Sequence, residues 1–250
     1  MSWKIYDDLL GVIPTDIRVR AVEQGPKWTR VLTDQPSCGI ALSMNDDFHR
    51  LPDISWRGLP LVELAQQAKS WNFALASVGM AAVNSYYSHP DIAAQHGFLR
   101  TQHPAHWGDM FVPYSGVSAD KNVAIIGHFP FAPQHFMRSR KFCMLERNLQ
   151  NGDLPDSAAE YILPEADYVF ISGSAWVNKT MPRLLELSQE AHNVIVGPSA
   201  TLAPSLLTKY RVTTVTGLVA QAPEKLFAAL GGIHCPGMFE HAYRVEAHCG

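Results

Sequence analysis

Cysteine is scarce in this chain: Cys38, Cys143, Cys235 and Cys249 are the four among 250 residues, and they form no Cys-x-x-Cys pair. Four scattered thiols argue against a disulfide framework, so reduced cysteines are expected. No apolar run approaches the roughly 18 residues of a membrane span, and residues 1–7 lack the basic and apolar regions of a signal peptide. We therefore expect a cytoplasmic protein with no membrane partner.

An excess of basic residues is also absent. The 20 Lys and Arg residues face 23 Asp and Glu residues, which gives a formal net charge of -3. A nucleic-acid-binding protein needs a basic face that neutralises phosphates, so no nucleic acid partner is expected. The length allows one large or two modest domains. The composition leaves the oligomeric state open, and a homo-oligomer is compatible with it.

A glycine-rich phosphate loop is missing where a dinucleotide enzyme would have one. The apolar run at residues 123–126 leads into Gly127-His128-Phe129-Pro130, with a single glycine. Nicotinamide and flavin sites use Gly-x-Gly-x-x-Gly so that backbone N–H groups can reach the pyrophosphate. Pro130 and Pro133 remove two further backbone donors. We therefore expect neither NAD nor FAD.

The chain does contain five short apolar runs, each followed by glycine or polar residues: 123–126, 143–145, 168–171, 194–196 and 213–215. Continuous apolar runs are typical of strands buried on both faces of a parallel sheet, and the helical stretches between them favour βαβ units. Helices are expected at 180–191 and from Pro223, and Ser157 and Thr180 are expected to cap helices. Because α/β sheets bind ligands at the carboxyl ends of their strands, this half predicts a ligand site.

The first part of the chain is organised differently. Residues 18–22, 28–32 and 38–42 predict a small antiparallel meander, and helices are expected at 6–10, 60–70 and 73–87. The turn-rich segment 113–120 predicts a linker. The predicted fold class is therefore α/β, with a small α+β domain at residues 1–112 followed by a Rossmann-like α/β domain with a mainly parallel sheet at residues 120–250.

Four acidic or basic side chains follow the predicted strands. His128 could act as a general acid or base, bind a metal or metal chelate, or simply shape its turn. Asp153 and Asp156 flank Pro155 and could bind a cation or amine, or serve as acid and base. Glu146 ends the second strand, where a carboxylate can accept hydrogen bonds from ligand hydroxyls, or could pair with Arg147 at the surface.

Small polar residues occupy the later loops. These are Ser172, Gly173 and Ser174, then Asn178 and Thr180, and finally Gly197, Pro198 and Ser199. Small side chains let a ligand approach the backbone closely, while hydroxyl and amide groups supply hydrogen bonds. Each loop alone could be an ordinary turn. Taken together, polar loops at one edge of a sheet predict a ligand site.

Two sets of histidines recur every seven residues: His89, His96 and His103, then His234, His241 and His248. This step would align them on a helix, but prolines and a glycine interrupt the first set. Cys235 and Cys249 accompany the second set without an established zinc spacing. We expect histidines in loops or at the surface, with a structural metal in the tail, or a contribution of His103 and His106 to a site, as alternatives.

The order of the motifs resembles one known family. The segments 68–72, 77–87, Val123-Ala-Ile-Ile-Gly-His-Phe-Pro130, 145–148, 152–161, 172–174, 177–180 and 196–199 look like those of the "putative heavy-metal chelation" family. The resemblance extends from about residue 3 to residue 231. It implies an enolase N-terminal-like domain before a Rossmann-like domain, a site in the cleft between them, and a role in making, hydrolysing or handling pterin- or siderophore-like chelators.

The resemblance also implies site residues by their places in these motifs. They are Asn84 from the first domain and Gly127, His128, Glu146, Asn148, Asp153, Pro155, Asp156, Ser172, Gly173, Asn178, Thr180, Gly197 and Ser199 from the second, to which we add the neighbours Phe129, Ser174 and Pro198. His128 and Asp153 are the expected proton-transfer or metal-facing groups, and Asn84 is expected to close the pocket.

The predicted function is binding of a small metal-chelating molecule or its precursor in the interdomain cleft, which the protein could also process. One alternative is a non-catalytic protein that binds or delivers a metal or metal chelate. Another is an S-adenosylmethionine-dependent transferase, motivated by the acidic end of the second strand but disfavoured by the single glycine of the first loop. The pattern specifies no metal; a divalent metal or metal chelate is compatible with it.

Overall fold

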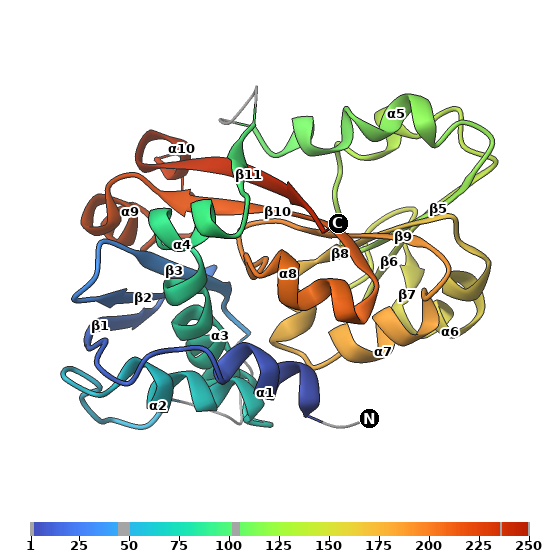
Figure 1. Ribbon diagram of the computed structural model, residues 1–250. Helices are drawn as coiled ribbons and strands as arrows, with labels where there is room; N and C mark the ends of the chain where they lie inside the picture. Colours follow the sequence, from blue (N-terminus) through green and yellow to red (C-terminus); the bar gives the residue numbers. More distant parts are fainter. Residues whose placement is uncertain (1–2, 45–50, 102–105, 236, 250) are drawn as a thin grey trace.

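Two β-sheets lie beside each other in the computed structural model (Figure 1), which describes residues 3–44, 51–101, 106–235 and 237–249. The smaller is an antiparallel meander of β1 (Val19–Gln24), β2 (Trp28–Thr33) and β3 (Cys38–Leu42). The helices α1 (Lys4–Leu10), α2 (Leu61–Ala65) and α3 (Phe73–Tyr87) accompany it. The meander and the helices predicted for this part are confirmed. Among the described helices, none is long and apolar enough to span a membrane.

Helix α3 is the structural centre of the first part. The side chain of Asn72 caps its start by accepting from the backbone N–H groups of Ala74 and Leu75, at 3.0 and 3.2 Å. Most of its residues are buried, because β3 packs on one side and α2 with the following turn on another. Gly79 permits this approach, since a Cβ there would lie 1.9 Å from the backbone nitrogen of Ala68.

The larger sheet has eight strands in the order β4-β11-β10-β9-β8-β5-β6-β7. They are β4 (Leu99–Arg100), β5 (Asn122–Ile126), β6 (Lys141–Glu146), β7 (Leu154–Pro155), β8 (Tyr168–Ser172), β9 (His192–Val196), β10 (Val212–Ala220) and β11 (Ala242–His248). Neighbours from β7 to β10 pair in parallel, so the five predicted strands are confirmed as β5, β6, β8, β9 and β10. The antiparallel edge of β11 and β4 was not anticipated.

The strand order fixes where a ligand site can form. From β5 the chain runs outward to β6 and β7 on one side, then returns to β8, β9 and β10 on the other. The carboxyl ends of β5 and β8 therefore flank the point where the direction reverses, and connections leave this point on opposite faces of the sheet. A crevice opens there in sheets of this kind, which places the polar loops after these strands around one position.

The remaining helices are short. They are α4 (Pro90–Gln95), α5 (Tyr114–Val117), α6 (Ala159–Ile162), α7 (Met181–Leu187), α8 (Pro204–Leu207), α9 (Pro223–Ala229) and α10 (Met238–His241), with 3-10 turns η1 (Gln66–Lys69), η2 (Gly108–Phe111), η3 (Pro133–His135), η4 (Asp156–Ala158), η5 (Leu163–Glu165), η6 (Gly173–Trp176) and η7 (Thr208–Tyr210). The helices predicted at 180–191 and from Pro223 are confirmed as α7 and α9.

Two local expectations were wrong. Ser157 lies inside η4 and caps no helix through its side chain. Thr180 does precede α7, but its hydroxyl donates to Asn178 Oδ1 at 2.6 Å instead of accepting from the helix. The segment 113–120, which is predicted to be a linker, contains the short helix α5, whose Tyr114 is buried.

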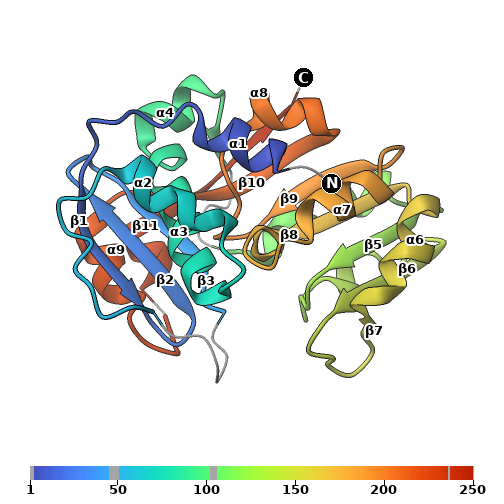
Figure 2. The same cartoon turned by 90° about the horizontal axis from the view of Figure 1, so that it is seen from below.

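The two sheets share one hydrophobic core, in which Tyr6 packs against Trp176. Tyr6 Oη also donates to the carbonyl oxygen of Trp176 at 2.6 Å. Figure 2 shows α1 and α3 on the side of the first part that faces the larger sheet. Lys179 makes cation–π contacts with two rings of the first part: its Nζ lies 5.9 Å from the Tyr6 ring centre and 5.6 Å from that of Phe73.

The burial of Lys179 predicts a pH dependence of stability. Burial lowers the pKa of its ammonium from 10.5 to about 8, while the unfolded chain keeps the ordinary value. Between these values the unfolded state binds more protons, so the cost of burying the charge is full below about pH 8 and disappears as the pH rises toward 10.5. Lys179→Met is therefore expected to be more stable than the wild type at neutral pH by about 1–3 kcal/mol, with a gap that closes on alkaline titration.

Urea unfolding at about pH 7 and at about pH 10 measures this difference in the free energy of unfolding between the two proteins. Methionine keeps the length of the side chain and the same left-handed backbone (φ 68°) at this position. Lys225→Met, at an exposed position of α9, is the matched control and is expected to leave the pH dependence unchanged. A gap between wild type and Lys179→Met that does not change with pH would contradict the assignment.

Candidate functional site

The carboxyl ends of β5, β6, β8 and β9 open onto a cavity of about 420 Å³, which we call the main cavity. The second part of the chain contributes His128, Phe129, Phe131, Glu146, Ser172, Ser174 and residues 196–199. The first part contributes Lys27, Trp28 and Leu42, while Trp107 and the C-terminal residues Cys235, Met238 and Phe239 complete the wall. The main cavity therefore lies between the two sheets, with aromatic rings on several sides.

His128 and Asp153 form a hydrogen-bonded pair at this cavity. His128 Nδ1 lies 3.0 Å from both carboxylate oxygens of Asp153, whose side chain is 0% exposed, while 27% of the His128 side chain is exposed. The backbone N–H of Gln150 also donates to Asp153 Oδ2, at 2.9 Å. In the neutral imidazole, a carboxylate beside Nδ1 favours the tautomer with the proton on Nδ1, which leaves the lone pair on Nε2. Within the described part of the chain, Nε2 has no hydrogen-bond partner.

Glu146 organises the neighbouring loops. Its Oε2 accepts from the backbone N–H of His128 at 3.1 Å, and its Oε1 accepts from those of Arg147 and Asn148 at 2.7 and 3.1 Å. Both oxygens are therefore already engaged by backbone amides. Gly127 makes the turn before His128 with φ 110°, and a Cβ there would lie 3.1 Å from the Phe129 ring, so both conformation and space favour glycine.

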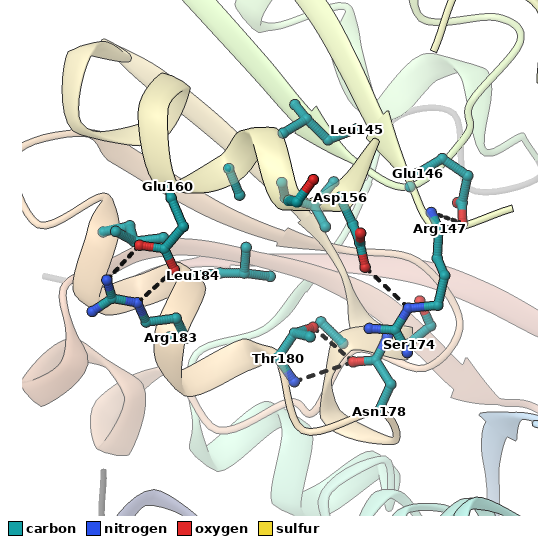
Figure 3. Close-up of a pocket in the computed structure, with 16 residues that line it drawn as sticks. Leu145, Glu146, Arg147, Asp156, Glu160, Ser174, Asn178, Thr180, Arg183 and Leu184 are labelled. Carbon is teal, nitrogen blue, oxygen red and sulfur yellow. Dashed lines mark hydrogen bonds and ion pairs between the residues drawn. The ribbon is translucent and has the colours of Figure 1, made fainter. Parts of the chain in front are cut away.

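A smaller cavity of about 210 Å³ adjoins the main one and is shown in Figure 3; we call it the side cavity. Asp156, Asn178 and Thr180 line it together with Arg147 and Arg183. The two cavities share Gly127, Glu146 and Ser174 in their walls. The polar loops that the sequence predicts as one site are therefore divided between two adjoining hollows.

The predicted residues sort into three sets. The main cavity is lined by Gly127, His128, Phe129, Glu146, Ser172, Ser174, Gly197, Pro198 and Ser199, and the side cavity by Gly127, Glu146, Asp156, Ser174, Asn178 and Thr180. Asn84, Asn148, Asp153, Pro155 and Gly173 line neither. Asp153 acts on the site through His128, and Gly173 packs against the backbone of Ser199 and Ala200.

Asn84 does not close the pocket, contrary to the expectation. It is 3% exposed, and its Nδ2 donates to the carbonyl oxygens of Ile40 and Ser199 at 2.8 and 3.1 Å. Its Oδ1 accepts from the Thr201 hydroxyl at 2.8 Å. Asn84 therefore connects α3 with β3 and with the loop after β9, and it positions a wall of the main cavity without touching the space inside.

Several lining residues were missed by sequence reasoning. Trp28, Trp107 and Phe239 come from three distant parts of the chain and carry no local signal of a site. Lys27 is the cation of the main cavity among the described residues, and its Nζ lies 5.7 Å from the centre of the Trp28 ring. Only the packing of the two sheets brings these residues together.

The recurring histidines are dispersed in the structure. His89 Nδ1 accepts from the backbone N–H of Asp91 at the start of α4, His96 Nδ1 lies 3.1 Å from Ser205 Oγ, and His248 Nδ1 lies 3.1 Å from Thr214 Oγ1. They lie on no common helix; His103 is outside the described residues. Across the described ranges, no group of three or more His, Cys, Asp and Glu side chains could hold a metal ion.

Comparison with known proteins identifies the family. A family described as "Putative heavy-metal chelation" matches residues 109–245, and a second family with the same description matches residues 6–87. The chain belongs to this heavy-metal chelation family. A crystal structure from the DUF364 family of Desulfitobacterium hafniense DCB-2, described as a protein with unknown function, shares 32% identity with a TM-score of 0.88 and covers 98% of both chains. This similarity includes both sheets.

Two further relatives are more distant. A DUF364 protein of unknown function from Pyrococcus horikoshii has 22% identity and a TM-score of 0.79 over 98% of both chains, which shows the shared fold alone. An uncharacterized protein of Methanocaldococcus jannaschii is 26% identical over 161 residues, 62% of this chain and 58% of its own length. The family description points to metal or chelate binding and to a small-molecule ligand. It names no reaction.

Proposed function

We propose that this member of the heavy-metal chelation family binds a small aromatic metal chelate in the main cavity, with His128 Nε2 as a ligand to the metal. The observation that carries the proposal is the His128–Asp153 pair at the cavity wall. Histidines that bind metals characteristically donate their other ring N–H to a carboxylate, which fixes the ring and raises the basicity of the free nitrogen. A fully buried Asp153 supplies this arrangement here.

The shape and chemistry of the main cavity support a chelate over a bare ion. His128 belongs to no group of three or more His, Cys, Asp or Glu side chains that could hold a metal ion among the described residues, so the ligand itself would supply remaining donor atoms. The rings of Trp28, Trp107 and Phe129 offer apolar surfaces for a planar organic molecule. Lys27 supplies a positive charge for the acidic oxygens of a chelator.

The same pair could transfer a proton to or from the bound chelator, which would make the protein an enzyme. The lone pair on Nε2 and the charge of Asp153 suit both metal binding and proton transfer. Release of a product from a precursor that carries no metal would indicate proton transfer. The transferase alternative has less support. Both carboxylate oxygens of Glu146 already accept backbone N–H groups, which reduces their capacity for ligand hydroxyls.

Calorimetry and visible spectroscopy with the equimolar complex of Co²⁺ and hydroxyquinoline sulfonate test the proposal. The wild type is expected to bind the complex and change its ligand-field spectrum. His128→Gln is expected to weaken binding by about 100-fold, and Asp153→Asn by about 10- to 100-fold, because the ring loses its orientation and basicity. His135→Gln, at a histidine outside both cavities, is the matched control.

Two outcomes would contradict the proposal. Equal affinity of wild type and His128→Gln for the complex would remove His128 from the site. Equally tight binding of Co²⁺ alone, lost on replacement of the histidines, would favour direct metal binding, the alternative in which the protein itself supplies the donors. Circular dichroism and the unfolding temperature of each variant show whether the fold is retained.

A further inference from the structure

The side cavity has its own chemical character. Its volume, about 210 Å³, exceeds the roughly 150 Å³ that admits a benzene ring. Its floor is apolar, with Ile126, Leu145, Leu184 and Leu187, and its rim is charged. Figure 3 shows the side chains of Arg147, Asp156, Asn178 and Thr180 gathered on one side of this space and those of Glu160 and Arg183 on another. A small amphipathic group matches such a lining.

The two arginines of the rim differ in which of their hydrogen-bond donors remain without a partner. All three nitrogens of Arg183 are engaged, because its Nε and Nη2 donate to Glu160 at 2.9 and 2.5 Å and its Nη1 donates to Glu186 at 2.8 Å. Glu160 and Glu186 thus share the single positive charge of Arg183. Arg147 uses only Nε, which donates to Asp156 at 3.0 Å. Its two Nη groups have no partner among the residues that the structure describes.

Asn178 adds a second set of donors beside Arg147. Its Oδ1 accepts from both the backbone N–H and the hydroxyl of Thr180, at 3.1 and 2.6 Å. These two donors fix the orientation of the amide, so Nδ2 faces away from Thr180 with its N–H groups available; no described residue accepts from it. Arg147 Nη and Asn178 Nδ2 are therefore side-chain donors of this rim that have no partner among the described residues. A carboxylate group can accept from both of these donors.

We propose that the side cavity binds a carboxylate at the end of a tail carried by the chelator, with Arg147 Nη and Asn178 Nδ2 as donors. The inference rests on the proposed function of the main cavity. The two cavities share Gly127, Glu146 and Ser174, so one ligand can pass from His128 to Arg147 across a common wall. A short methylene chain would lie on the apolar floor, and the guanidinium would hold the carboxylate in its planar, two-pronged geometry.

A matched pair of chelators tests the inference. Hydroxyquinoline carrying a glutaryl amide tail ends in a carboxylate, and hydroxyquinoline carrying a butyramide tail does not. As Co²⁺ complexes, the acidic probe is expected to bind the wild type about tenfold more tightly, an advantage that shrinks as salt is added because Arg147 is about half exposed. In Arg147→Met the two probes are expected to bind alike. Arg57→Met, at an exposed arginine outside both cavities, should keep the preference.

The outcomes separate the two proposals. Equal affinity of both probes for the wild type, with binding still lost in His128→Gln, overturns the carboxylate site and leaves the main cavity's function standing. A tenfold preference that survives in Arg147→Met also overturns it. Glutarate alone tests the side cavity without any chelator: the side-chain amide signals of Asn178 in an NMR titration are expected to shift in the wild type and to stay fixed in Arg147→Met. Unmoved signals in the wild type up to saturating glutarate count against the inference.

Discussion

Replacement of Gly173 by alanine is expected to destabilise the protein by about 3 kcal/mol or more and to abolish binding in the main cavity. A Cβ at this position would lie 2.3 Å from the carbonyl carbon of Ser199 and 2.3 Å from the backbone nitrogen of Ala200. Backbone atoms cannot rotate aside as a long side chain can. The start of η6 and the loop after β9 would have to separate, and both contribute to the wall of the main cavity.

Urea unfolding and binding of the Co²⁺–hydroxyquinoline complex measure the two effects of Gly173→Ala. Gly116→Ala is the matched control, because a Cβ at 116, inside α5, meets no atom within 4 Å. That control is expected to leave binding intact and to change stability by less than about 1 kcal/mol, in the stabilising direction. A Gly173→Ala variant that unfolds at the same urea concentration as the wild type would show that the two backbones do not approach as closely as described.

The parallel sheet could be predicted because burial on both faces leaves its strands as unbroken apolar runs. The run at 143–145 is shorter than β6 (Lys141–Glu146), since the polar ends of that strand interrupt the pattern. Strands β4 and β11 were missed for another reason. Two-residue β4 has no pattern of its own, and β11 pairs with β10 through contacts that local sequence does not encode.

Only part of the candidate site could be predicted from the sequence, and the geometry of the sheet explains which part. His128 and Glu146 could be found because strand ends in a parallel sheet share one edge, a rule that needs no knowledge of side-chain direction. Which side chains turn toward which hollow depends on tertiary packing, so neither the side cavity nor the free donors of Arg147 could be anticipated. Trp107 and Phe239 lie outside the strands and carry no local signal, so their place in the cavity wall could not be anticipated either.

Replacement of Asn84 by leucine is expected to cost about 3 kcal/mol of stability and to weaken binding in the main cavity without altering the His128–Asp153 pair. Leucine fills a similar volume, but it leaves the carbonyl oxygens of Ile40 and Ser199 and the hydroxyl of Thr201 without their partner. These groups are buried, so water does not readily replace the lost hydrogen bonds, and leaving the groups unpaired costs free energy. The loop after β9 then loses its attachment to α3, and the position of Ser199 in the cavity wall relaxes.

A double-mutant cycle with Thr201→Val isolates the bond between the two parts of the chain. Removal of both Asn84 and the Thr201 hydroxyl is expected to cost about 1 kcal/mol less than the sum of the single changes, because one interaction is lost twice in that sum. Ser85→Ala is the matched control. Ser85 follows Asn84 in the chain, and its Oγ lies 3.3 Å from Ser37 Oγ, within the first part alone. It is expected to lower stability modestly and to leave binding unchanged. If Asn84→Leu costs no more than this control, Asn84 does not hold the loop after β9, and the wall of the main cavity must be fixed by other contacts, such as the bond from the backbone N–H of Leu42 to Ser199 Oγ.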